Sequence, residues 1–190
     1  MSAFQKRPRR RDPDVRYFNP LQIFQARQIF DQAEKLTQKY FRLNPEGLKT
    51  NRYDVKTLVE LHKHEVADQA FAHLCRYFVQ KKEGPDGTRE FPHYRVCLQD
   101  HRILDAVDRG RSFIKYEPLM LYIAVHELTH VVRFSHGHSN FDARDAEKEQ
   151  EEEKVNAFTQ NILGSVPDRG VRVVVDCFNK RYDMNALFQN

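Results

Sequence analysis

Apolar residues recur along the first part of the chain at the spacing of an amphipathic helix. Between Ile29 and Tyr40 they follow the positions of one helix face. Asn19 is a residue type that caps helix N-termini, and Pro20 suits the first helical turn. The pattern therefore predicts a helix over residues 20–41.

A second apolar stripe runs from Val55 to Phe78 and predicts another long helix over residues 54–81. The turn-rich sequence Gly-Pro-Asp-Gly at 84–87 is expected to end this half of the chain. Two of the histidines on the stripe stand two residues apart, so a helix would point them to different faces. We therefore interpret all three as structural residues rather than metal ligands: His62, His64 and His73.

Short stretches with alternating or β-branched residues predict a small sheet. They cover residues 93–99, 113–116 and 171–175. A short helix that ends at Gly110 is expected between the first two of them. If the backbone of residues 94–98 lay at an edge of the sheet, it could pair with an extended peptide.

A third helix is expected to begin near Pro118 and to be buried on all sides. Every residue from Leu119 to Val125 is apolar, which is typical of a helix in the core. The sequence His-Glu-Leu-Thr-His follows directly at residues 126–130. Polar side chains at such a position are costly to bury unless they are satisfied, and a bound metal ion would satisfy them.

The motif at 126–130 has the H-E-x-x-H pattern of zinc hydrolases. Residues four apart lie on one helix face, so His126 and His130 can offer two imidazole nitrogens to one Zn²⁺ ion. Glu127 stands in the same turn and is the candidate general base. A catalytic zinc site takes three protein ligands, so a third ligand has to come from elsewhere in the chain.

One source of the third ligand is an acidic stretch at residues 142–153. This stretch leads into an apolar face that runs from Val155 to Leu163, and the two together predict a helix over residues 147–163 that ends at Gly164. The acidic residues stand in its first turns, where the helix dipole favours negative charge.

The motif and this helix together resemble the gluzincins. Residues 152–163 read E-x-x-V-N-A-F-T-x-x-I-L, which is most similar to the ImmA/IrrE-type peptidases over about residues 119–163. The resemblance implies that Glu152 is the third zinc ligand and that Asn156 supports a histidine ligand. It also implies a zincin fold and peptide-bond hydrolysis. Glu149 and Glu153 are alternative ligands on the same helix.

A second source of the third ligand is the turn after the motif. His136 lies ten residues after His126, the spacing of a longer three-histidine zinc motif, although Arg133 replaces the glycine of that motif. His138 resembles the third-histidine region of SprT-like proteases. If Glu152 is the ligand, either histidine could instead stabilise an oxyanion. We interpret the remaining polar candidates near the motif as structural: Tyr116, Tyr122 and Arg133.

Composition indicates a single globular domain. The 190 residues suffice for one sizeable core. Residues 1–16 hold six basic and two acidic residues, which accounts for the whole formal net charge of +4. We predict a disordered basic tail over residues 1–16 and the domain over residues 17–190. The basic run at 6–11 could touch nucleic acid, but the body of the chain has no excess charge to support this.

Cysteine usage and hydropathy favour the cytoplasm. The three cysteines form no C-x-x-C pair, so neither a disulfide framework nor a cysteine zinc site is expected. The chain shows no secretory signal, no transmembrane stretch and hence no membrane partner.

The sequence thus predicts a mostly helical α+β zincin with a small sheet beside the H-E-x-x-H helix. The expected function is zinc-dependent hydrolysis of a protein or peptide substrate, with Glu127 as base. Two alternatives remain: a non-catalytic zinc-binding protein, and a nucleic-acid-associated protein.

Overall fold

The computed structural model describes residues 12–44, 48, 53–82, 88–110 and 113–181. Within these ranges the chain forms five α-helices and one three-stranded sheet, which confirms the predicted mostly helical α+β fold. The elements follow one another as α1 (Pro20–Phe41), β1 (Tyr53–Lys56), β2 (Ala72–Lys82), β3 (Thr88–Leu98), α2 (Asp100–Arg109), α3 (Tyr116–Ser135), α4 (Asp145–Leu163) and α5 (Arg169–Asp176). Two short 3-10 turns (Leu58–Glu60 and Lys63–Glu65) and a π-helical stretch (Cys177–Arg181) complete it.

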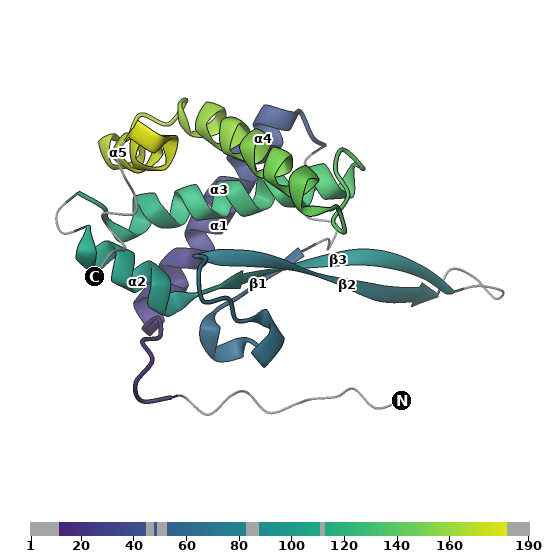
Figure 1. Ribbon diagram of the computed structural model, residues 1–190, viewed down its shortest axis with the longest axis horizontal. Helices are drawn as coiled ribbons and strands as arrows, with labels where there is room; N and C mark the ends of the chain where they lie inside the picture. Colours follow the sequence, from purple (N-terminus) through teal and green to yellow (C-terminus); the bar gives the residue numbers. More distant parts are fainter. Residues whose placement is uncertain (1–11, 45–47, 49–52, 83–87, 111–112, 182–190) are drawn as a thin grey trace.

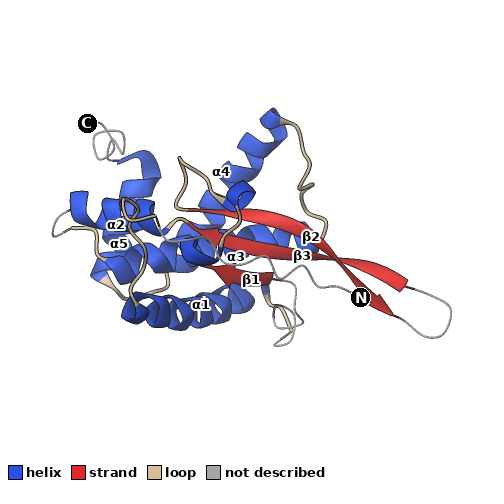
Figure 2. Ribbon diagram, turned by 90° about the horizontal axis from the view of Figure 1, so that it is seen from below, coloured by secondary structure: helices blue, strands red, loops and turns tan. Residues whose placement is uncertain are grey.

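The sheet has the order β1-β3-β2 (Figure 2). β1 pairs with β3 in parallel from Tyr53 opposite Tyr94 to Lys56 opposite Cys97. β2 and β3 form an antiparallel ribbon over their full length, which extends past the helices in Figure 1. The strand predicted at 93–99 is thus part of β3. Because β3 is the central strand, residues 94–98 do not lie at an edge, and the edge strands on either side are β1 and β2.

Helix α3 is the centre of the molecule, and α1, α4 and α5 all contact it. Its residues 119–125 are all buried, as predicted from their apolar composition. The helices lie on one face of the sheet (Figure 1), where Leu74, Val96 and Leu98 join their core. Helix α3 therefore carries its motif between the sheet and α4.

The predicted N-terminus of α1 is confirmed. The Asn19 side chain accepts a hydrogen bond from the backbone N–H of Gln22 at 2.8 Å, and the Gln22 side chain accepts one from the N–H of Asn19 at 2.9 Å. This capping box satisfies two backbone donors at the helix start. The helices that end at Gly110 and Leu163 are also confirmed, as α2 and α4.

The helix predicted over residues 54–81 is wrong. The segment forms β1, the two 3-10 turns and β2 instead. On β2, Leu74 packs into the core beneath the helices, whereas Cys75 packs on the opposite face with Leu58 and Leu61. A strand that is buried on both faces loses the alternation of apolar and polar residues that would reveal it.

Two predicted strands are also wrong. Residues 171–175 lie in α5, where Val171 and Val174 are buried three positions apart and Asp168 caps the helix by accepting from the Val171 N–H at 2.9 Å. Packing against α3 outweighs the strand preference of β-branched residues here. Phe113 lies in a turn, its N–H donating to the carbonyl of Gly110 at 3.0 Å, and Tyr116 already begins α3.

Residues 12–16, the last five of the predicted tail, lie within the described part of the chain. Arg16 forms ion pairs with Asp105 and Asp108 of α2, and Val15 packs against the cluster around Leu58. The basic run at 6–11 and the turn at 84–87 lie outside the described residues. Among the described helices, none is long and apolar enough to cross a membrane.

Candidate metal centre

The two histidines of the motif lie one turn apart in the second half of α3. His126 and His130 face the same side of the helix, with ring centroids 4.9 Å apart. Both lie mostly buried, with 17% and 9% of their side-chain surfaces exposed. The arrangement follows directly from the four-residue spacing on a regular helix.

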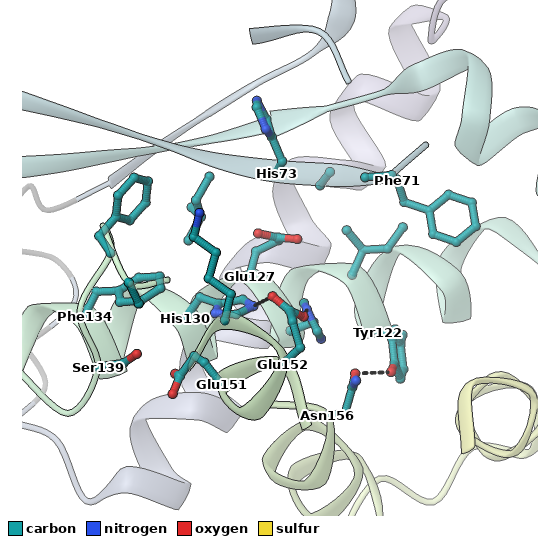
Figure 3. A pocket seen from close by; sticks show the side chains of 18 of the residues that line it. Phe71, His73, Tyr122, Glu127, His130, Phe134, Ser139, Glu151, Glu152 and Asn156 are labelled. Carbon is teal, nitrogen blue, oxygen red and sulfur yellow. Dashed lines mark hydrogen bonds and ion pairs between the residues drawn. The ribbon is translucent and has the colours of Figure 1, made fainter. Parts of the chain in front are cut away.

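Glu152 approaches both histidines from α4 (Figure 3). Its Oε2 lies 3.4 Å from His126 Nε2, and its Oε1 lies 3.1 Å from His130 Nε2. The donor atoms of the three residues all lie within 4.8 Å of one another, so they form a group that can hold a metal ion. Glu152 stands at the position that the resemblance implies, and Glu149 and Glu153 are exposed outside the group.

The spacing of these atoms fits a tetrahedral ion. Two ligands bound about 2.0 to 2.2 Å from zinc at a tetrahedral angle stand roughly 3.3 to 3.5 Å apart. The two nitrogen–oxygen distances of 3.4 and 3.1 Å are close to this value. Each carboxylate oxygen faces a different imidazole, as expected for a carboxylate that closes a site between them.

The pKa values of Glu152 and Glu127 are shifted in opposite directions. Burial raises the pKa of Glu152, but hydrogen bonds and charge interactions with His126 and His130 outweigh it and hold the pKa well below its usual range. Burial raises the pKa of Glu127 to about 7; the charge of His126 acts to lower it and the charge of Glu152 to raise it. A cation at the centre would add a positive charge and lower the pKa of Glu127 again.

A buried ion pair fixes how α4 lies against α3. Arg133 donates to Glu151 through Nε at 2.5 Å and through a terminal nitrogen at 2.8 Å, and both side chains are buried. Arg133 also lies over the ring of Phe158, 5.2 Å from its centroid. Because Glu151 is held by Arg133, its neighbour Glu152 is turned toward the histidines.

Asn156 hydrogen-bonds Tyr122 rather than a histidine. Tyr122 donates its hydroxyl to Asn156 Oδ1 at 3.3 Å (Figure 3), and its ring stacks on His126 at a centroid distance of 6.2 Å. The Nδ1 atoms of His126 and His130 are buried and have no hydrogen-bond partner within the described residues. The hydrogen bond expected behind a metal-binding histidine is therefore not seen, and ring stacking orients the imidazoles instead.

The structure does not bring His136 or His138 to this centre. Both are exposed beyond the end of α3, where their rings stack on each other at 6.1 Å. His136 is held there by a 2.8 Å hydrogen bond between its Nδ1 and the carbonyl of Val132. Neither lines the cavity at the centre, so neither is placed to complete the site or to face an oxyanion.

The centre opens into a cavity of about 590 Å³ between α3, α4 and the start of β2. Sequence reasoning missed the cavity wall formed by residues 70–74, where the chain enters β2, because that segment was predicted to be helical. It also missed Lys148, which alone among the described lining residues carries a permanent positive charge. Aromatic side chains form much of the remaining wall: Phe71, Phe134, Phe141 and Phe178.

Comparison of the chain with protein-family models, with curated proteins and with solved structures finds no match. The function proposed below therefore rests on the geometry of the centre.

Proposed function

We propose that this protein is a zinc-dependent peptidase whose metal is held by His126, His130 and Glu152. The observation that carries the proposal is the convergence of three donor groups from two helices within 4.8 Å. Two imidazoles and one carboxylate are a ligand set of hydrolytic zinc enzymes. Zinc in such a site polarises a carbonyl group and lowers the pKa of water in its open position.

Glu127 is the proposed general base. It follows His126 directly on α3, is 7% exposed, and lines the cavity. Its carboxylate takes a proton from the attacking water and passes that proton to the amine that leaves when the peptide bond breaks. A site that only held α3 and α4 together would need no such carboxylate.

The start of β2 is the proposed binding edge for the substrate. β2 has β3 on one side and no strand on the other side within the described residues. Residues 70–74, of which 72–74 belong to β2, line the cavity, so an extended peptide could pair with this backbone and pass the centre. The aromatic wall favours a substrate with a bulky apolar side chain near the scissile bond.

The substitution Glu127→Gln tests the proposal. It keeps the shape of the side chain but removes the base, so the rate of peptide cleavage should fall about 100-fold to 10,000-fold. Cleavage would be followed with a library of fluorogenic peptides, and bound zinc by elemental analysis. Glu147→Gln is the matched control, because Glu147 is exposed on the first turn of α4.

Cleavage by the Glu127→Gln variant at the wild-type rate would contradict the mechanism. If the wild type binds zinc but cleaves no member of the library, the non-catalytic zinc-binding alternative is favoured. The nucleic-acid alternative rests on the basic run at 6–11, which lies outside the described residues.

A further inference from the structure

A second group of metal-ligating side chains lies on the opposite face of the sheet. His73 and Cys75 stand two residues apart on β2, and Cys97 stands on β3, directly opposite His73. Figure 3 shows the ring of His73 on the side of β2 that faces away from Glu127 and His130. The donor atoms of this group therefore lie apart from the centre proposed for hydrolysis, although His73 also belongs to the β2 segment that lines the cavity.

The three donor atoms of this group point toward one another. His73 Nε2 lies 3.4 Å from Cys75 Sγ, and Cys75 Sγ lies 3.8 Å from Cys97 Sγ. All three atoms lie within 4.8 Å of one another. A buried cysteine alone often packs as a small apolar residue, but convergence of two sulfurs and an imidazole nitrogen needs a further reason.

A tetrahedral zinc ion accounts for both distances. Two sulfurs bound about 2.3 Å from zinc at a tetrahedral angle stand roughly 3.8 Å apart. An imidazole nitrogen about 2.05 Å from zinc and a sulfur stand roughly 3.5 Å apart in the same geometry. The observed 3.8 Å and 3.4 Å agree with these values.

The register of the strands argues against a disulfide between the two cysteines. Cys75 is paired with Arg95, and Cys97 with His73, so the cysteines are diagonal neighbours. Diagonal neighbours in an antiparallel pair have their Cα atoms about 7 to 8 Å apart. A disulfide needs a Cα separation below about 7 Å, so the backbone would have to move.

The surroundings suit a site without net charge. Cys97 is fully buried next to Leu58 and Leu61, where an unbalanced charge would be costly. A divalent ion bound by two thiolates and a neutral imidazole carries no net charge. The nearby Glu65 carboxylate is already engaged by the Tyr77 hydroxyl and by Arg95.

A metal ion can reach this group from the side of β2. His73 and Cys75 are only partly buried, so an ion can enter without opening the core. A neutral imidazole that is protonated on Nδ1 keeps a free lone pair on Nε2, and Nε2 is the atom of His73 that faces Cys75.

We propose that His73, Cys75 and Cys97 bind a second zinc ion, with water or another small donor in the fourth position. The site would link β2 to β3 behind the strand edge that borders the cavity. This proposal does not depend on the peptidase function.

Cobalt(II) separates the two sites, because cobalt bound by thiolates shows sulfur-to-metal charge-transfer absorption and the site on α3 has no sulfur. The metal-free, reduced full chain would be titrated with Co²⁺. The wild type should develop this band, and the double variant His126→Ala, His130→Ala should retain it. In the variants Cys75→Ser and His73→Asn, the affinity for Co²⁺ that is measured from this absorption band should fall at least tenfold. The matched control Cys177→Ser should leave it unchanged, because Cys177 lies beyond α5.

Alkylation of the wild type adds a readout that needs no variant. Zn²⁺ should slow alkylation of Cys75 at least tenfold and leave the rate at Cys177 unchanged, as read by mass spectrometry of peptides. Absence of the charge-transfer band in folded wild type would overturn the proposal. Equal alkylation of Cys75 with and without Zn²⁺ would overturn it too, as would a full-strength band in a Cys75→Ser variant whose circular dichroism matches the wild type.

Discussion

The ion pair of Arg133 determines which of the neighbouring glutamates on α4 faces the histidines. Glu149, Glu151, Glu152 and Glu153 are all close enough in sequence to serve as a ligand. The buried pair between Arg133 and Glu151 fixes the rotation of α4 and leaves Glu152 on the side of the histidines. Which glutamate faces the histidines depends on how the two helices pack. The local sequence therefore limits the candidate ligands to a short acidic run, and only the resemblance to the gluzincins indicates Glu152 among them.

Replacing Arg133 should therefore be costly. In Arg133→Met, Glu151 would remain buried without a partner, and the free energy of unfolding should fall by about 3 to 5 kcal/mol. The double variant Arg133→Met, Glu151→Leu should recover much of this loss, because no charge stays buried. Urea denaturation measures both.

The control for this prediction is the pair of Arg76 and Asp142, whose aspartate side chain is 67% exposed. Arg76→Met should cost less than about 1 kcal/mol. A loss in Arg133→Met no larger than the loss in Arg76→Met would show that the pair does not hold α4.

At the scale of elements, the proposed zinc ion would join α3 to α4. An ion that binds only the folded chain stabilises it by about 2.7 kcal/mol at a concentration 100 times its dissociation constant. A chelator should therefore lower the melting temperature of the zinc-loaded protein. Cys75→Ser would be used as the background, so that the second proposed site does not contribute.

Glu152→Ala should abolish this effect of the chelator and lower the bound zinc, whereas the exposed neighbour variant Glu153→Ala should keep both. Thermal unfolding followed by circular dichroism, with and without chelator, gives the comparison. Full zinc content in Glu152→Ala would rule out Glu152 as the third ligand.

The elements that could be predicted are the helices whose apolar residues form a clear pattern. α1 has one buried face, and α3 is apolar from Leu119 to Val125, so both patterns are clear. β2 is covered on both faces at Leu74 and Cys75, and α5 is built from β-branched residues that local preference assigns to a strand. The histidine pair was predictable from its spacing, whereas the β2 wall of the cavity depended on an element that the pattern concealed.

At the scale of the whole molecule, Asp100 ties three separate parts of the chain together. It stands in the first turn of α2, and its carboxylate accepts hydrogen bonds from the backbone N–H groups of Phe18 and Leu58, both at 2.9 Å. Burial raises the pKa of Asp100 to about 6, although the backbone hydrogen bonds act in the opposite direction. The folded chain thus binds this proton more tightly than the unfolded chain does.

The stability that this proton contributes is complete below the unfolded pKa of about 4 and is lost as the pH rises through about 6. The free energy of unfolding should lose about 2 to 3 kcal/mol over this window because of Asp100. The variant Asp100→Asn cannot titrate at this position. The difference in the free energy of unfolding between wild type and variant, measured by urea denaturation from pH 4 to 7, therefore gives the contribution of Asp100. A difference that does not change with pH would contradict the raised pKa of Asp100.

The end of the β2–β3 ribbon that lies farthest from the helices is expected to open locally. Phe78 and Val79 are neighbours on β2 and point to opposite faces, yet 57% and 50% of their surfaces are exposed. Neither face of the ribbon is covered by a core at this point, and β1 ends its pairing with β3 at Tyr94. Amide protons there should exchange with solvent long before those near Leu74, because separation of the ladder exposes little new apolar surface. One strand would thus begin beside the core at Leu74 and run into a part that no core covers, and it could fray from its far end without disturbing the wall of the cavity.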